Sequence, residues 1–108
     1  MQLSAQPGYE VLAEVFQEAL DQAQAGKGRE RHASEEPFEH QEICEGARKC
    51  GAGAMAYQVR KKILESVRLF DLYGVDQAEG DVLGAMVYAA AQLIVMREKH
   101  IGGRPCGE

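Results

Sequence analysis

Residues that mark sheet proteins and secreted proteins are scarce in this sequence. It has no tryptophan, 3 prolines and 3 cysteines in 108 residues, and no segment alternates apolar and polar side chains as a half-buried strand does. We therefore predict an all-α protein. The odd number of cysteines, with no pairing pattern, is not typical of a disulfide-stapled secreted domain.

Positive charge is also in deficit. The chain carries 12 Lys and Arg against 17 Asp and Glu, a net charge of −5. Proteins that bind duplex nucleic acid use a broad cationic surface, so we expect no general binding of this kind. A local anion pocket remains compatible with this balance.

A targeting or membrane segment is missing from the pattern as well. No basic stretch followed by an apolar one opens the chain. The longest apolar run, Val82 to Met96, is shorter than the about 20 residues that cross a bilayer. We expect a cytoplasmic protein without a membrane partner.

Helical periodicity is what the sequence does contain. Its length and 45% hydrophobic content predict one domain with a thin core at residues 9–101, between a flexible lead-in (1–8) and a flexible tail (102–108). We expect about four helices. The first runs from Tyr9 to Ala25 and ends at Gly26, and its apolar stripe is Leu12, Val15, Phe16, Ala19, Leu20 and Ala23.

The middle of the chain predicts two more helices. Ser34 is a suitable N-cap for a second helix that ends at Cys50. A third helix runs from Ala54 to Tyr73, and Gly74 is placed to end it. The predicted buried stripe of the third helix consists of Met55, Val59, Ile63, Val67 and Phe70.

The last predicted helix is apolar on nearly every side. Asp76, with Glu79 three residues later, predicts a capping box at its start, and it continues to Lys99. A helix of this kind is central to a fold or shared between subunits. We expect a helical hairpin or bundle that forms a homo-oligomer through this helix, with Gly84 allowing close approach.

A basic segment, Gly26-Lys27-Gly28-Arg29-Glu30-Arg31-His32, stands out in this acidic chain. Glycines let successive backbone N–H groups turn toward one point, and neighbouring cations pair well with phosphate. We interpret four of its residues as contacts for an anionic ligand, namely Lys27, Arg29, Arg31 and His32. The alternative is a solvated loop.

The third helix adds an aromatic ring and further cations. Tyr57 and Lys61 are one helical turn apart, with Arg60 beside them and Arg68 two turns beyond Lys61. A ring can stack on a nucleobase while the cations bind phosphate. The alternative is a solvated helix face with a Lys61–Glu65 ion pair.

The carboxylates of the second predicted helix indicate a different function, which is binding of Mg²⁺. Three of them repeat at every third residue in the second helix, and such ladders hold Mg²⁺ when a second helix faces them with more carboxylates. The three are Glu39, Glu42 and Glu45.

The segment Glu79-Gly80-Asp81-Val82-Leu83 resembles the metal-binding helix of MazG-like all-α nucleoside triphosphate pyrophosphohydrolases. This resemblance implies a Mg²⁺-dependent enzyme that uses Glu79 and Asp81 with the second-helix ladder. The family's helix carries Glu-x-x-Asp, whereas Ala78 stands three residues before Asp81. The resemblance therefore supports a related fold more than the reaction.

The central part of the chain is similar to small phage-encoded helical proteins. This similarity rests on residues 26–33, Phe38, Gln41, the helix from Gly53 to Leu69, and Leu83-Gly84-Ala85-Met86. It implies a phage accessory protein in the host cytoplasm. Several phage proteins of this size are oligomers that sequester nucleotide immune signals.

We therefore predict a homo-oligomeric anti-defence protein that binds a nucleotide-like anion and has no catalytic residue, cofactor or metal. The alternatives are the Mg²⁺-dependent pyrophosphohydrolase and a protein inhibitor of a host defence system. A zinc site at His40, Cys44 and Cys50 is not expected, because the usual structural-zinc ligand pairs are missing.

Overall fold

The structure, a computed structural model, describes residues 3–25 and 37–101. This part of the chain contains four α-helices, one short 3-10 helix and no strand, which confirms the predicted all-α class. In chain order the elements are α1 (Glu10–Ala25), η1 (Phe38–His40), α3 (Glu42–Cys50), α4 (Ala52–Tyr73) and α5 (Val75–Ile101).

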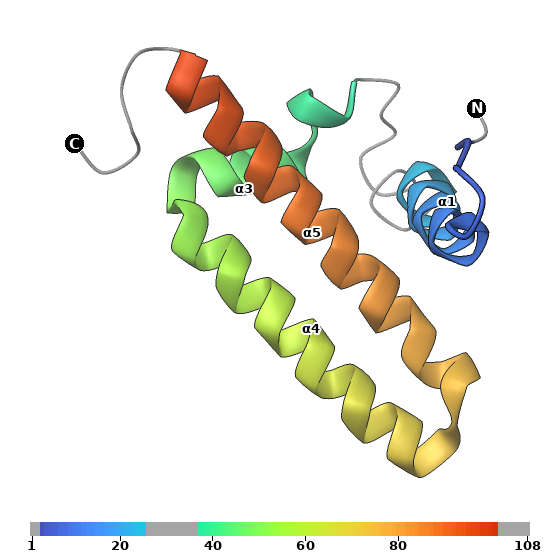
Figure 1. Ribbon diagram of the computed structural model, residues 1–108. Coiled ribbons are helices and arrows are strands. Elements are labelled where there is room, and N and C mark those ends of the chain that lie inside the picture. Colours follow the sequence, from blue (N-terminus) through green and yellow to red (C-terminus); the bar gives the residue numbers. More distant parts are fainter. Residues whose placement is uncertain (1–2, 26–36, 102–108) are drawn as a thin grey trace.

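The two longest helices, α4 and α5, run antiparallel and lie side by side (Figure 1). Gly74 alone connects them. It has a φ of 98° and a ψ of −177°, and its N–H donates to the carbonyl oxygen of Phe70 at 2.9 Å. The predicted end of this helix at Gly74 is therefore confirmed.

All other described elements contact α5. Among the described helices α1 contacts α5 alone, and the amide nitrogen of Gln22 donates to the carbonyl oxygen of Gly80 at 3.1 Å. At the opposite end of α5, α3 and the start of α4 close the main core. This core consists of Cys44, Ala47, Met55, Ala91 and Val95.

The fully buried apolar side chains are small. Five of the eight are alanines, and among the residues whose burial is described no leucine, isoleucine, phenylalanine or tyrosine is fully buried. Small side chains let helix backbones approach closely, but they remove little apolar area from water. The five alanines are Ala19, Ala47, Ala78, Ala85 and Ala91.

The predicted second helix is interrupted. Pro37 is extended, with a φ of −53° and a ψ of 147°, and is followed by η1. Gln41 is extended as well, so α3 begins only at Glu42. Its predicted N-cap, Ser34, lies outside the described residues. At the last helix, α5 begins at Val75, which places Asp76 inside the first turn rather than at the N-cap.

The predicted buried stripe of α4 is wrong in its second half, because Ile63, Val67 and Phe70 are exposed. In this half the row that faces α5 includes Lys62 and Ser66 instead. Gly84 makes this possible: a Cβ there would lie 3.4 Å from Lys62 Cδ, so the Lys62 stem packs over the glycine. Its ammonium group lies 5.5 Å from the centroid of the Tyr88 ring.

The predicted buried stripe of α1 is wrong at two positions. Leu12 and Phe16, assigned to the buried stripe of α1, are exposed, and Ala19 is its buried residue. The lead-in folds back along this helix, since the Leu3 N–H donates to Gln17 Oε1 at 2.9 Å.

One helix of the described chain, over Val75–Glu98, is long and apolar enough to cross a membrane by length and composition alone. The sequence-based expectation rested only on the apolar run Val82–Met96, and the helix extends beyond this run at both ends. Core helices of soluble proteins meet the same criteria.

The connection at Gly74 generates a stability prediction. Its backbone conformation is one that only glycine adopts without strain, so Gly74→Ala should lower the free energy of unfolding by about 1–3 kcal/mol. Gly80→Ala is the matched control, because a Cβ there meets nothing within 4 Å, and it should raise stability by about 0.5–1 kcal/mol. Urea unfolding followed by circular dichroism measures both. A Gly74→Ala variant as stable as the parent would contradict this role.

Candidate functional site

The α4 side that faces away from α5 carries an exposed aromatic ring and, one helical turn later, two exposed cations. Arg60 and Lys61 follow Tyr57 by three and four residues, so both neighbour its ring on the helix surface. All three side chains are exposed, Tyr57 by 60%. Leu64, one turn beyond Arg60, is exposed too. We call Tyr57, Arg60, Lys61 and Leu64 the outer patch.

Lys61 is exposed to solvent, whereas its neighbour Lys62 is half-buried. Lys62 packs between α4 and α5. The Lys61–Glu65 ion pair considered above does not form, because Glu65 pairs with Arg68. Lys61 has no ion pair with any residue that the structure describes.

Arg68 is committed to a contact within its own helix. Its Nε and Nη2 donate to the two carboxylate oxygens of Glu65 at 2.9 and 2.6 Å. This hydrogen bonding lowers the pKa of Glu65 and raises the pKa of Arg68. The structure therefore brings Tyr57, Arg60 and Lys61 together, and it places Arg68 two turns away with its guanidinium already paired.

The basic segment lies outside the described residues. Lys27, Arg29, Arg31 and His32 fall between the end of α1 at Ala25 and the extended residue Pro37. Their contribution to a ligand site stays a prediction.

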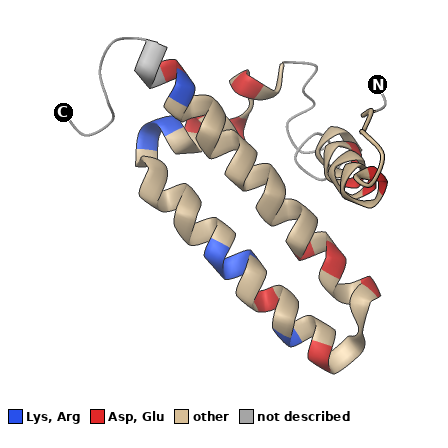
Figure 2. Cartoon of the chain, viewed as in Figure 1, with Lys and Arg blue, Asp and Glu red and all other residues tan. Residues whose placement is uncertain are grey.

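The carboxylates of the enzyme alternative are divided between the two ends of α5 (Figure 2). Glu79 and Asp81 lie in its first turns beside Gly74, whereas η1 and α3 pack near Glu98. Asp81 and Glu98 are separated by about 26 Å along the helix axis. The structure does not bring the two sets together within one chain. The candidate carboxylates at the Glu98 end of α5 are Glu39, Glu42 and Glu45.

The described residues contain no group of three His, Cys, Asp or Glu side chains placed to hold a metal ion. Cys44 belongs to the core, and burial raises the pKa of its thiol. Cys50 is exposed at the end of α3, and both cysteines are free.

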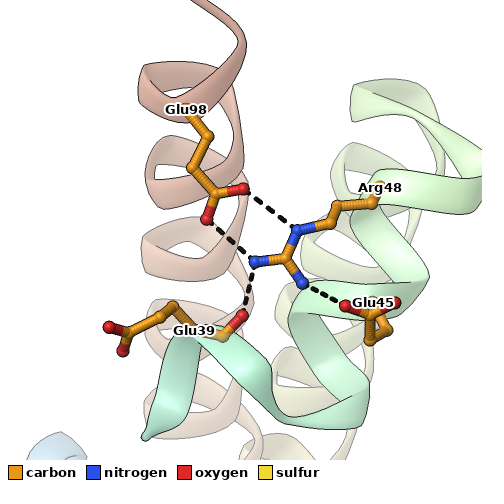
Figure 3. A network of polar contacts seen from close by, with 4 residues as sticks. All are labelled: Glu39, Glu45, Arg48 and Glu98. Atoms are coloured by element: carbon orange, nitrogen blue, oxygen red, sulfur yellow. Dashed lines mark hydrogen bonds and ion pairs between the residues drawn. The ribbon is translucent and has the colours of Figure 1, made fainter. Parts of the chain in front are cut away.

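A contact that the sequence analysis missed holds this end of the molecule together (Figure 3). Arg48 donates from Nε and Nη2 to the two carboxylate oxygens of Glu98, at 3.0 and 2.8 Å. Its Nη1 pairs with Glu45, and its Nη2 also donates to the carbonyl oxygen of Glu39. One guanidinium thus connects η1, α3 and α5, and this network is called the Arg48 clamp.

The clamp is structural rather than a ligand site. Its guanidinium is already hydrogen-bonded on all three nitrogens, which leaves little donor capacity for an added anion. Hydrogen bonding from Arg48 lowers the pKa of Glu98. Arg48 and Glu98 are 50 residues apart, so no local spacing in the sequence indicates their contact.

No protein-family model, curated protein or solved structure matches the chain. The functional assignment therefore rests on the chemistry of its own residues.

The clamp predicts a pH-dependent stability. Glu98→Gln should lower the Tm at neutral pH, because Arg48 loses its charged partner on α5. The pKa of Glu98 in the folded protein lies below its ordinary value of 4.5. The pair therefore stabilises the fold fully above that pH, and its contribution is lost as pH falls through the lower, folded pKa. The Tm difference between parent and variant should shrink in acid.

The matched control is Glu65→Gln, which breaks an ion pair confined to α4. Its effect on Tm should be smaller than that of Glu98→Gln, since no second element is released. Thermal unfolding of all three proteins between neutral and acidic pH measures this. A Glu98→Gln variant with the parent's Tm at neutral pH would show that the clamp does not hold α3 on α5.

Proposed function

We propose that this protein binds a small, anionic, nucleotide-like ligand at the outer patch and does not turn it over. The observation that carries the proposal is the exposed Tyr57 ring with Arg60 and Lys61 as its neighbours on the helix surface. The ring offers a stacking surface for a base, and the two cations offer donors to phosphate.

The magnitudes fit a ligand that combines a base with phosphate. Stacking a base on an aromatic side chain contributes about 1–3 kcal/mol, and a hydrogen bond to a charged group contributes about 1.5–3 kcal/mol before screening by solvent. Two cations and one ring on an open helix face give moderate affinity. The basic segment, with Lys27, Arg29, Arg31 and His32, stays a prediction for further phosphate contacts, since it lies outside the described residues and α1, which precedes it, contacts α5 and not α4.

The separation of the carboxylates supports binding without catalysis. A Mg²⁺-dependent hydrolase needs its carboxylates around one metal, and in one chain the two candidate sets lie at opposite ends of α5. We extend the proposal to a nucleotide immune signal as the ligand only on the resemblance to small phage-encoded helical proteins suggested by the sequence, which no matching family, protein or structure supports. On this proposal the protein is an anti-defence factor that sequesters such a signal in the host cytoplasm.

Calorimetry against mono-, di- and cyclic nucleotides tests the site. Tyr57→Ala and Lys61→Ala should each weaken binding roughly 10- to 100-fold, because one removes the stacking surface and the other a phosphate contact. Lys49→Ala removes an exposed cation from α3 and is the matched control, which should bind like the parent. If no nucleotide binds, or if all three variants lose affinity equally, the outer patch is not a specific site.

A second measurement separates binding from catalysis. Purified protein incubated with nucleoside triphosphates and Mg²⁺ should release no pyrophosphate. Glu42→Gln is the informative variant, because Glu42 belongs to both possible registers of the Glu-x-x-Glu motif. Mg²⁺-dependent pyrophosphate release that disappears in Glu42→Gln would replace this proposal with the enzyme alternative.

A further inference from the structure

The α4–α5 pair leaves one of its two broad faces without any described element over it. The rows by which the helices face each other are marked by the contact of Lys62 with Gly84 and Tyr88, and by the buried residues Ser66 and Ala85. The next residue along a helix lies about 100° further round. The residues that directly follow the facing residues in the sequence therefore lie on one side of each helix, about 100° round from the seam. We call them the advanced row of each helix.

The middle parts of these advanced rows are apolar, whereas the position that follows the seam residue Ala78 is Glu79. On α4, Ile63, Val67 and Phe70 follow Lys62, Ser66 and Leu69. On α5, the corresponding rotation from the facing row again gives only apolar residues from Val82 to Met96, of which Leu93 and Met96 are exposed by 47% and 46%. The α5 residues are Val82, Met86, Ala89, Leu93 and Met96.

The two rows lie on the same side of the pair. Both helices are right-handed, so the advanced row is clockwise from the facing row when each helix is viewed from its own N-terminus. Because α4 and α5 are antiparallel (Figure 1), the two clockwise directions point to the same face. We call this surface, Ile63, Val67 and Phe70 with the five α5 residues, the apolar face.

We propose that a second copy of this chain covers the apolar face, so that the two α4–α5 pairs form a four-helix bundle. This inference does not depend on the proposed ligand site. It also relocates the assembly surface predicted from the sequence, because Gly84 packs against Lys62 of its own chain and is not available to a neighbouring subunit.

The size of the face matches what a stable dimer needs. α4 has 22 residues and is therefore about 33 Å long, and two helices side by side are about 20 Å wide. The whole broad side of the pair, to which the apolar face belongs, thus covers roughly 660 Å², close to the ~800 Å² that each partner contributes to a standard interface. Five of the exposed large apolar residues lie on this surface, namely Ile63, Val67, Phe70, Leu93 and Met96.

The charges that flank the face suit a second copy in the opposite direction. Along its outer edges Arg60, in the first half of α4, and Arg97 lie on the side of the Arg48 clamp, whereas Asp71 and Glu79 lie near Gly74. A copy in the same direction would put like charges together, which is unfavourable. A copy in the opposite direction puts the basic end of each chain over the acidic end of the other.

The first test uses the unmodified protein. Light scattering should give at least twice the 11.8 kDa of one chain, and the Tm should rise with protein concentration over a roughly hundredfold range, because dimerisation stabilises the fold by mass action. A monomer with a concentration-independent Tm would overturn the proposal. A monomer that instead partitions onto phospholipid vesicles would overturn it too and assign the face to a membrane.

A matched pair of variants locates the interface. Val67 and Leu72 are both on α4 and are exposed by 56% and 59%, but only Val67 belongs to the apolar face. Val67→Glu should raise the dissociation constant roughly 100-fold or more, because a charge would be buried without a partner, whereas Leu72→Glu should assemble like the parent. Equal effects of the two variants, in either direction, would contradict this face.

Charge reversal tests the direction. Glu79→Arg alone should weaken assembly, and adding Arg97→Glu to it should restore assembly, because the exchanged charges again meet their opposites. If the single variant assembles as well as the parent, the copies do not lie in opposite directions. The concentration dependence of Tm in the parent requires no variant, so the proposal stays testable even where a substitution prevents folding.

Discussion

The close packing of α4 on α5 is the constraint on which the other features depend. A single residue, Gly74, connects the two helices, so they must lie side by side from the connection onward. Small residues on α5, among them Ala78, Gly84 and Ala85, let α4 approach along this seam. Both Lys62 and Ser66 are consequently drawn into the seam, and the larger apolar side chains of α4 are rotated out of it.

The same constraint explains why a local pattern predicted the ends of the helices better than their buried faces. Gly74 ends α4 through its own backbone conformation, which depends on nothing distant, and its role was visible in the sequence. The burial of Lys62 depends on Gly84, which is 22 residues away and leaves the space that the lysine stem fills. Hydrophobic spacing alone predicted that Ile63, Val67 and Phe70 are buried. Spacing within one helix contains no information about the surface of the helix that packs against it.

The two polar sites differ in the same way. Tyr57, Arg60 and Lys61 are neighbours because of helical spacing, so the sequence was sufficient to group them. The Arg48 clamp joins residues 50 positions apart and exists only because α3 folds back against the last turns of α5. Its effect is to hold the core around Cys44 closed at the end of α5 where the α4–α5 pair has no covalent connection.

Each side of α4 therefore has a different physical character. One side packs on α5, a second carries the outer patch with its ring and cations, and a third carries the apolar face. Arg60 lies at the boundary between the last two. A ligand held at the outer patch would thus lie beside an assembled interface without being buried in it. Variants at Lys61 and Val67 can separate ligand binding from assembly, because these residues point in directions about 120° apart on one rigid helix, whereas Arg60 belongs to both sites.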